Sequence, residues 1–292
     1  MDQPPKSPPK LQPTPEDLLR RYEKEQRNSA IQRENELQNS LAPFRVGSVP
    51  YLNALPLTRG LEGDLIFATP AKLAEMLRRN ELDAALVSIT EVLFNDSYDI
   101  LDGIAVASLG EVKSVLLAHK RPLREIKEVF CDTASLTSVN LLKVLLAEQS
   151  IVARFAPLPS YDAANSCDAV LLIGDPAIDF VRSSPPHEIY DLGTAWYELT
   201  QLPFVYAVWA LRRGIDHRRL RAHLREARDF GLDTLDYIIS SRTEYDHQFR
   251  KDYLGWHIHY HLSSEEKRGI AKFMELLRKH GFGPVHDPRY VF

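Results

Sequence analysis

From Phe44 onward, short apolar segments alternate with segments whose apolar residues recur at helical spacing. The sequences DAALVSI (83–89) and DAVLLIGD (168–175) are typical of strands that are buried on both faces. Thr69 and Pro70 fit the N-cap and first residue of a helix that has Leu73 and Leu77 on its apolar face. Such alternation predicts an α/β protein with a mainly parallel sheet covered by helices, in one sheet or two.

Length and composition further limit the class of protein that this chain can be. A chain of 292 residues has room for two lobes of ordinary domain size. A net charge of −4 without a basic stripe argues against nucleic acid as a partner. Neither Cys131 nor Cys167 lies in a C-x-x-C pair, so both are expected to be buried thiols. The longest apolar run, 204–211, is too short to cross a membrane, and no signal-like stretch is visible, so we expect a cytoplasmic protein.

Residues 1–43 are expected to form an arm outside the globular part. Residues 1–15 contain six of the nineteen prolines, and we predict that they are disordered. Residues 16–40 are helix formers with balanced charge, and they predict a solvated helix weakly packed through Leu18, Leu19 and Tyr22. This helix is either an appendage without chemistry or a docking element for a partner. The sequence leaves the choice between a monomer and a homodimer open.

Four predicted strands run directly into small polar residues that begin a helix. In open α/β sheets, ligands bind beyond the carboxyl ends of strands, where helix N-termini attract anions. Small polar residues are also ordinary N-caps, but four such junctions together predict a cleft for a small anion. The predicted cleft residues at these junctions are Ser48, Tyr51, Asn53, Ser88, Ser135, Thr137, Ser138 and Asp175.

Common catalytic and cofactor motifs are missing from the sequence. There is no G-x-S-x-G elbow, P-loop, strand-linked G-x-G-x-x-G or H-E-x-x-H. His257, His259 and His261 would share one face of a strand, an arrangement that zinc can use. No accompanying carboxylate network is evident, so we predict a surface strand of alternating polarity and no metal or other cofactor.

Six stretches at and around these junctions resemble the chorismate dehydratase family, which opens the futalosine route to menaquinone. They are RVGSVPYLNALPL (45–57), LDAALVSITEVL (82–93), GEVKSVLLA (110–118), DTASLTSVNLLKVLL (132–146), AVLLIGDPAI (169–178) and DLGTAWYELTQLPFVYAVWALR (191–212). The resemblance extends from about Phe44 to the end of the chain. It implies a type II periplasmic-binding-protein-like fold, with two α/β lobes around a central cleft. Lobe 1 would combine 44–112 with 207–292, and lobe 2 would be 113–206, with crossovers near 112–118 and 204–210.

The resemblance also implies an activity, that of a lyase which removes water from chorismate to give 3-[(1-carboxyvinyl)oxy]benzoate. By motif match, Ser114 in GEVKSV and Asn53 in PYLNA would be its catalytic residues, positioning the substrate and stabilising the leaving group. The substrate's own enolpyruvyl carboxylate would take the ring proton. Ser135, Thr137 and Ser138 would hold a substrate carboxylate, while Asp175 either lines the cleft or caps its helix.

Two other functions stay open at this point. A dihydroxynaphthoate synthase of the same pathway would share the fold but needs a protein base, classically His, and the polar junctions contain none. The other is a non-catalytic sensor or small-anion-binding protein on the same scaffold.

Overall fold

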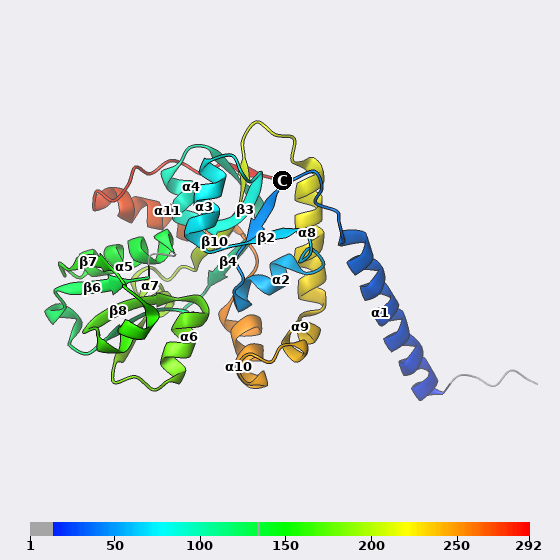
Figure 1. Cartoon of the computed structure of the whole chain (residues 1–292), viewed down its shortest axis with the longest axis horizontal. Coiled ribbons are helices and arrows are strands. Elements are labelled where there is room, and N and C mark those ends of the chain that lie inside the picture. The colour runs from blue at the N-terminus through cyan, green and yellow to red at the C-terminus, as the bar shows by residue number, and fades with distance from the viewer. Residues whose placement is uncertain (1–13, 133–134) are drawn as a thin grey trace, which may run out of the picture.

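The computed structural model describes residues 14–132 and 135–292. The first thirteen residues of the predicted disordered arm lie outside the described part of the chain. Figure 1 shows two lobes side by side and a long helix, α1, that extends away from them. No described helix is both long enough and apolar enough to cross a membrane.

Each lobe is built on its own twisted sheet, and each sheet is parallel except for one strand. The first sheet has the order β11 (Tyr290–Val291), β4 (Tyr98–Ser108), β10 (Phe204–Arg212), β3 (Ala84–Ser88), β1 (Val46–Ser48), β2 (Leu65–Phe67). The second has the order β7 (Arg154–Pro157), β6 (Glu128–Cys131), β8 (Ala169–Ile173), β5 (Val115–His119), β9 (Glu188–Asp191). Strands β3 and β8 are buried along their whole length, as the apolar runs predicted.

The antiparallel strands, β10 and β5, are the ones that follow the two connections between the lobes. The chain leaves the first sheet after Ser108 and enters the second at Val115, then returns between Thr200 and Phe204. Residues 204–206 therefore belong to the first sheet, whereas the sequence-based division had them in lobe 2. We propose that the lobes follow this division of the strands.

Helices cover both sheets. Those of the first lobe are α2 (Leu55–Thr58), α3 (Pro70–Arg78), α4 (Ile89–Phe94), α8 (Arg218–Asp233), α9 (Leu235–Ser241), α10 (His247–Asp252) and α11 (Ser264–Lys279). Those of the second lobe are α5 (Leu136–Glu148), α6 (Gly174–Arg182) and α7 (Leu192–Thr200). Short 3₁₀ helices occur at Leu52–Ala54, Leu123–Glu125 and Tyr161–Ser166, and a π-helical turn at Tyr253–His257. Helix α11 packs against β10 and also reaches α5, so it joins the two lobes.

Helix α1 (Pro15–Leu37) is solvated, as predicted, but its packing end is the opposite one. Leu18, Leu19 and Tyr22 are more than half exposed, because the first turns project beyond the body. The helix is attached at its last turns, where Leu37 is buried and Arg33 bonds Glu226 of α8 at 2.7 Å.

Candidate active site

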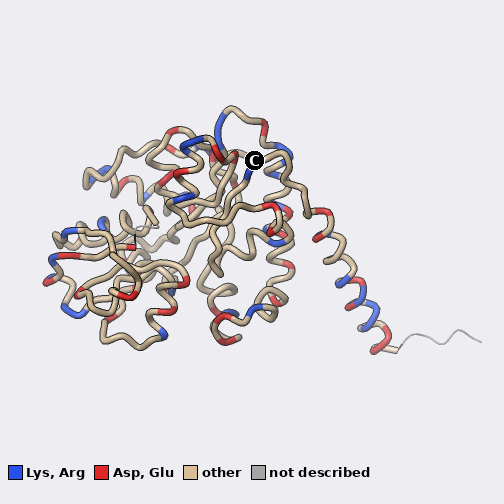
Figure 2. The backbone as a smooth tube through the Cα atoms, in the orientation of Figure 1, with Lys and Arg blue, Asp and Glu red and all other residues tan. Residues whose placement is uncertain are grey.

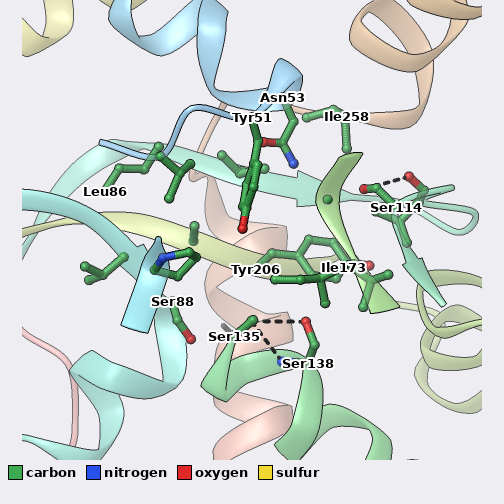
Figure 3. A pocket seen from close by; sticks show the side chains of 18 residues that line it. Tyr51, Asn53, Leu86, Ser88, Ser114, Ser135, Ser138, Ile173, Tyr206 and Ile258 are labelled. Carbon is green, nitrogen blue, oxygen red and sulfur yellow. Dashed lines mark hydrogen bonds between the residues drawn. The ribbon is translucent and has the colours of Figure 1, made fainter. Parts of the chain in front are cut away.

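A cavity of about 70 Å³, partly open to solvent, lies between the lobes (Figure 3). Its polar lining comes from both lobes and from the connection between them. The lining side chains with hydroxyl or amide groups are Tyr51, Asn53, Ser88, Ser114, Ser135, Ser138 and Tyr206. The described lining contains no Lys, Arg, Asp, Glu or His.

Most of the residues expected at the site therefore line the cavity, but three do not. Ser48, at the end of β1, is fully buried, and its hydroxyl has no hydrogen-bond partner among the described residues. Thr137 and Asp175 lie at the starts of α5 and α6, outside the lining.

Thr137 joins the two lobes to each other. Its hydroxyl lies 2.5 Å from the Ser88 hydroxyl and accepts a hydrogen bond from the Thr90 backbone N–H at 3.0 Å. In return, the Thr137 backbone N–H donates to the Ser88 hydroxyl at 2.9 Å. These contacts close one side of the cavity, where sequence reasoning had expected Thr137 to hold a ligand.

Asp175 makes a second contact between the lobes. Its carboxylate accepts a hydrogen bond from the backbone N–H of Leu52 at 3.4 Å. Its neighbour Gly174 has a φ of +61°, in the left-handed region. A Cβ at this position would lie 3.3 Å from the ring of Tyr51, so glycine allows the backbone to pack closely against that ring. Burial is the main reason why the pKa of Asp175 rises to about 6. The helix starts thus face each other across the cleft, as predicted, but Thr137 and Asp175 contact protein there.

Ser114 and Asn53 meet at a buried tyrosine, Tyr253, in the π-helical turn. The Tyr253 hydroxyl donates to Ser114 Oγ at 2.8 Å, and the Asn53 side chain is near enough to the same phenol to lower its pKa. Burial raises the pKa of Tyr253, so the phenol is neutral and can act as a donor. Ser114 Oγ accepts this bond and donates one of its own to the carbonyl of Val112 at 3.4 Å, which is long and therefore weak.

Ser114 is fixed by the backbone on either side. Its carbonyl accepts from the Gly174 N–H at 2.7 Å, at the start of α6. The preceding residue, Lys113, has a positive φ of 64°, which a non-glycine residue adopts only where its surroundings hold it.

The group that holds this turn is the carboxylate of Asp191, the N-cap of α7. It accepts hydrogen bonds from the backbone N–H groups of Lys113 at 2.8 Å, Val112 at 3.1 Å and Thr194 at 2.9 Å. Burial raises the pKa of Asp191, although these donors act in the opposite direction. One side chain therefore caps a helix and shapes the turn that presents Ser114.

Ser135 and Ser138 line the cavity at the N-terminus of α5. Ser135 Oγ accepts from the backbone N–H of Ser138 at 3.3 Å and lies 3.1 Å from its hydroxyl. A thirteen-residue helix presents partial positive charge at this end, which suits an anionic ligand in a cavity without cations.

The histidine-containing segment does not form the predicted strand. His257 ends the π-helical turn, and its ring bonds the carbonyl of Glu111 at 3.0 Å. Only the following residues are extended, with His259 paired to Ala107 as a single bridge. The three histidines therefore do not share one face, because the π-helical turn rotates His257 out of the alternation.

Sequence reasoning missed Tyr253, Asp191 and Tyr206. The sequence DLGT (191–194), with Asp three residues before Thr194, was a usable N-cap signal for Asp191. Tyr206 lines the cavity and lies 3.1 Å from Ser108 Oγ, but as an aromatic residue in an apolar strand it is typical of a core position. Nothing local marks Tyr253, because its role depends on contacts with residues far away in the sequence.

Two lobes, each with a single antiparallel strand beside the crossover, define a protein of the periplasmic-binding-protein fold. Solved structures agree with this assignment. A protein of Archaeoglobus fulgidus superposes with a TM-score of 0.64 at 18% identity, covering 82% of this chain and 97% of the other. The aliphatic sulphonate binding protein of Escherichia coli gives a TM-score of 0.56 at 15% identity, covering 85% and 93%.

Sequence comparisons then identify the family. Residues 44–279 match the family described as menaquinone biosynthesis. The chorismate dehydratase of Thermus thermophilus is 35% identical over 271 residues, which is 85% of this chain and 100% of that protein. The chorismate dehydratase of Campylobacter jejuni is 25% identical, covering 77% and 89%. The chain belongs to this menaquinone-biosynthesis family, as the resemblance of its motifs implied.

Proposed function

We propose that this protein is a chorismate dehydratase, a hydro-lyase that converts chorismate into 3-[(1-carboxyvinyl)oxy]benzoate and water. The main support is the match to the Thermus thermophilus chorismate dehydratase, which spans that relative's whole length. In the reaction a ring C–H bond and the C–O bond to the 4-hydroxyl break, and the ring becomes aromatic. The leaving oxygen departs as water, so it needs a proton and donors around it.

The cavity provides groups for this chemistry. The Ser114 hydroxyl donates only a long 3.4 Å bond to the Val112 carbonyl, so we infer that it turns to donate to the departing oxygen, with the Asn53 amide as a second donor. Ser135 and Ser138 line the cavity at the start of α5, and we infer that they hold a substrate carboxylate there. No described lining residue is a strong base, which is consistent with proton removal by the substrate's own carboxylate.

Separate observations argue against the two other functions. A dihydroxynaphthoate synthase needs a protein base such as His, and none is among the described residues of the cavity wall. Against a non-catalytic sensor stands the similarity to two chorismate dehydratases. We keep the cytoplasm as the expected location, supported by two free, buried cysteines.

Incubation of the purified protein with chorismate tests the proposal. We expect an aromatic ether product, seen by ultraviolet absorbance and by a mass loss of one water. Binding of chorismate without turnover would favour the non-catalytic alternative, and no binding at all would contradict the proposed substrate.

Tyr253→Phe is expected to lower kcat by about tenfold with little change in KM, because one donor to Ser114 is lost. In a Ser114→Ala background the same change should have a smaller effect, since the two residues act through one bond. Tyr260→Phe is the matched control: Tyr260 is also buried, but its hydroxyl has no hydrogen-bond partner among the described residues. Equal effects in both backgrounds would contradict this role for Tyr253.

A further inference from the structure

The extended segment after the π-helical turn presents two histidines on one side. Ile258, Tyr260 and Leu262 are buried, while the alternating residues His259 and His261 face outward. The backbone of His259 is held by Ala107 of β4, with N–H···O distances of 2.7 and 3.0 Å. The backbone that carries the two imidazoles is therefore fixed in position.

The two rings lie together and share a carboxylate neighbour. Their centroids are 5.4 Å apart, with planes inclined by 17°. Glu266, in the first turn of α11, is 3% exposed, and its Oε1 lies 3.2 Å from Nε2 of His261. Its other oxygen accepts from the backbone N–H of Ser263 at 2.9 Å, so the carboxylate is fixed in place by the helix cap.

Potential ligand atoms of His259, His261 and Glu266 all lie within 4.8 Å of one another. In a tetrahedral zinc site, bonds of about 2.0–2.1 Å place neighbouring ligand atoms about 3.4 Å apart. Modest side-chain rotations of the two histidines would bring the ligand atoms to the separation that zinc requires. Glu266 is also the carboxylate that the sequence alone did not connect to the histidines, since it belongs to the cap of the next helix.

The chemistry of the three groups selects the kind of ion. Two imidazole nitrogens and one carboxylate oxygen suit zinc and similar transition-metal ions, whereas magnesium and calcium prefer oxygen ligands alone. Three protein ligands would leave a fourth position for water, on the side where the His261 side chain is 58% exposed.

We propose that His259, His261 and Glu266 form a binding site for a divalent transition-metal ion such as zinc. A bound ion would tie the extended segment to the N-terminus of α11. Ile258, next to His259, lines the cavity between the lobes, so the ion would stiffen one wall of that cavity without touching a ligand inside it. This proposal does not depend on the reaction proposed above.

Metal titration of the full chain, without a polyhistidine tag and after treatment with a chelator, tests the site. Addition of Co²⁺ should produce visible absorption bands of low-symmetry coordination, and Zn²⁺ should displace it. Zn²⁺ should also raise the melting temperature of the wild-type protein. His259→Ala and His261→Ala should each weaken Zn²⁺ binding by about tenfold or more. Glu266→Gln, which keeps an oxygen acceptor for the Ser263 cap, should also weaken it.

His257→Ala is the matched control, since His257 belongs to the same motif but lies outside the cluster. It should bind Zn²⁺ as the wild type does. Absence of Zn²⁺ binding in the wild type would overturn the proposal. So would unchanged affinity in the His259→Ala and His261→Ala variants, because the ion would then be held elsewhere.

Discussion

Ser114→Ala and Asn53→Ala are each expected to lower kcat for chorismate dehydration by about 100-fold or more, with the protein still folded. Each change removes a hydrogen-bond donor that we propose acts on the departing oxygen, in a cavity whose described lining has no carboxylic acid or cationic side chain to replace it. Steady-state kinetics with chorismate, together with circular dichroism of each variant, measure the effect.

Ser166→Ala serves as the control for Ser114→Ala, because Ser166 is exposed in lobe 2 and outside the cavity. It should keep wild-type kinetics. If both Ser114→Ala and Asn53→Ala retain near-normal rates, these residues do not carry the reaction and the proposed site is wrong.

Asp191→Ala is expected to lower the free energy of unfolding by about 3 kcal/mol or more, a larger loss than for an ordinary helix cap. The substitution leaves three backbone N–H groups, those of Val112, Lys113 and Thr194, without their acceptor. Because the turn at Lys113 presents Ser114, kcat should fall as well, even though Asp191 does not line the cavity. Urea denaturation and steady-state kinetics measure the two effects.

Asp246→Ala is a matched control for this prediction. Asp246 caps α10 through a 2.8 Å bond from Phe249 N–H, and its only other contact with a distant segment among the described residues is an exposed ion pair with Arg182 at 3.1 Å, which contributes little to stability. Its loss should cost about 0.5–2 kcal/mol. Equal destabilisation by the two substitutions would show that Asp191 acts only as a helix cap. Asp191→Asn, which keeps one carbonyl oxygen, should fall between the wild type and Asp191→Ala.

The sequence predicted elements that have strong local signals. The capping box of Ser263 and Glu266 marks the start of α11, and Thr69 with Pro70 marks α3. Strand β4 was missed because Asp99, Asp102 and Gly103 interrupt its apolar pattern. The structure keeps the strand continuous: Gly103 takes a positive φ of 85°, and Lys267 neutralises Asp102 at 2.7 Å.

The candidate site was harder to predict from local sequence patterns. Family motifs and polar strand ends were enough to select Ser114, Asn53 and Ser135, which line the cavity. They did not distinguish Thr137, whose hydroxyl bonds the opposite lobe, because a helix start looks the same whether it faces ligand or protein. Tyr253 was invisible, since its bond to Ser114 spans 139 positions of the chain.

The absence of charged side chains from the described cavity wall has a consequence for how a substrate arrives. A dianion would be held by hydroxyl groups and a helix end. It would meet a protein whose net charge is −4 and whose basic and acidic residues are interspersed along the backbone (Figure 2). Long-range attraction would therefore contribute nothing to the encounter, and like charges would slow it slightly. Raising the ionic strength should then speed up capture, the reverse of the response of an enzyme with a cationic funnel.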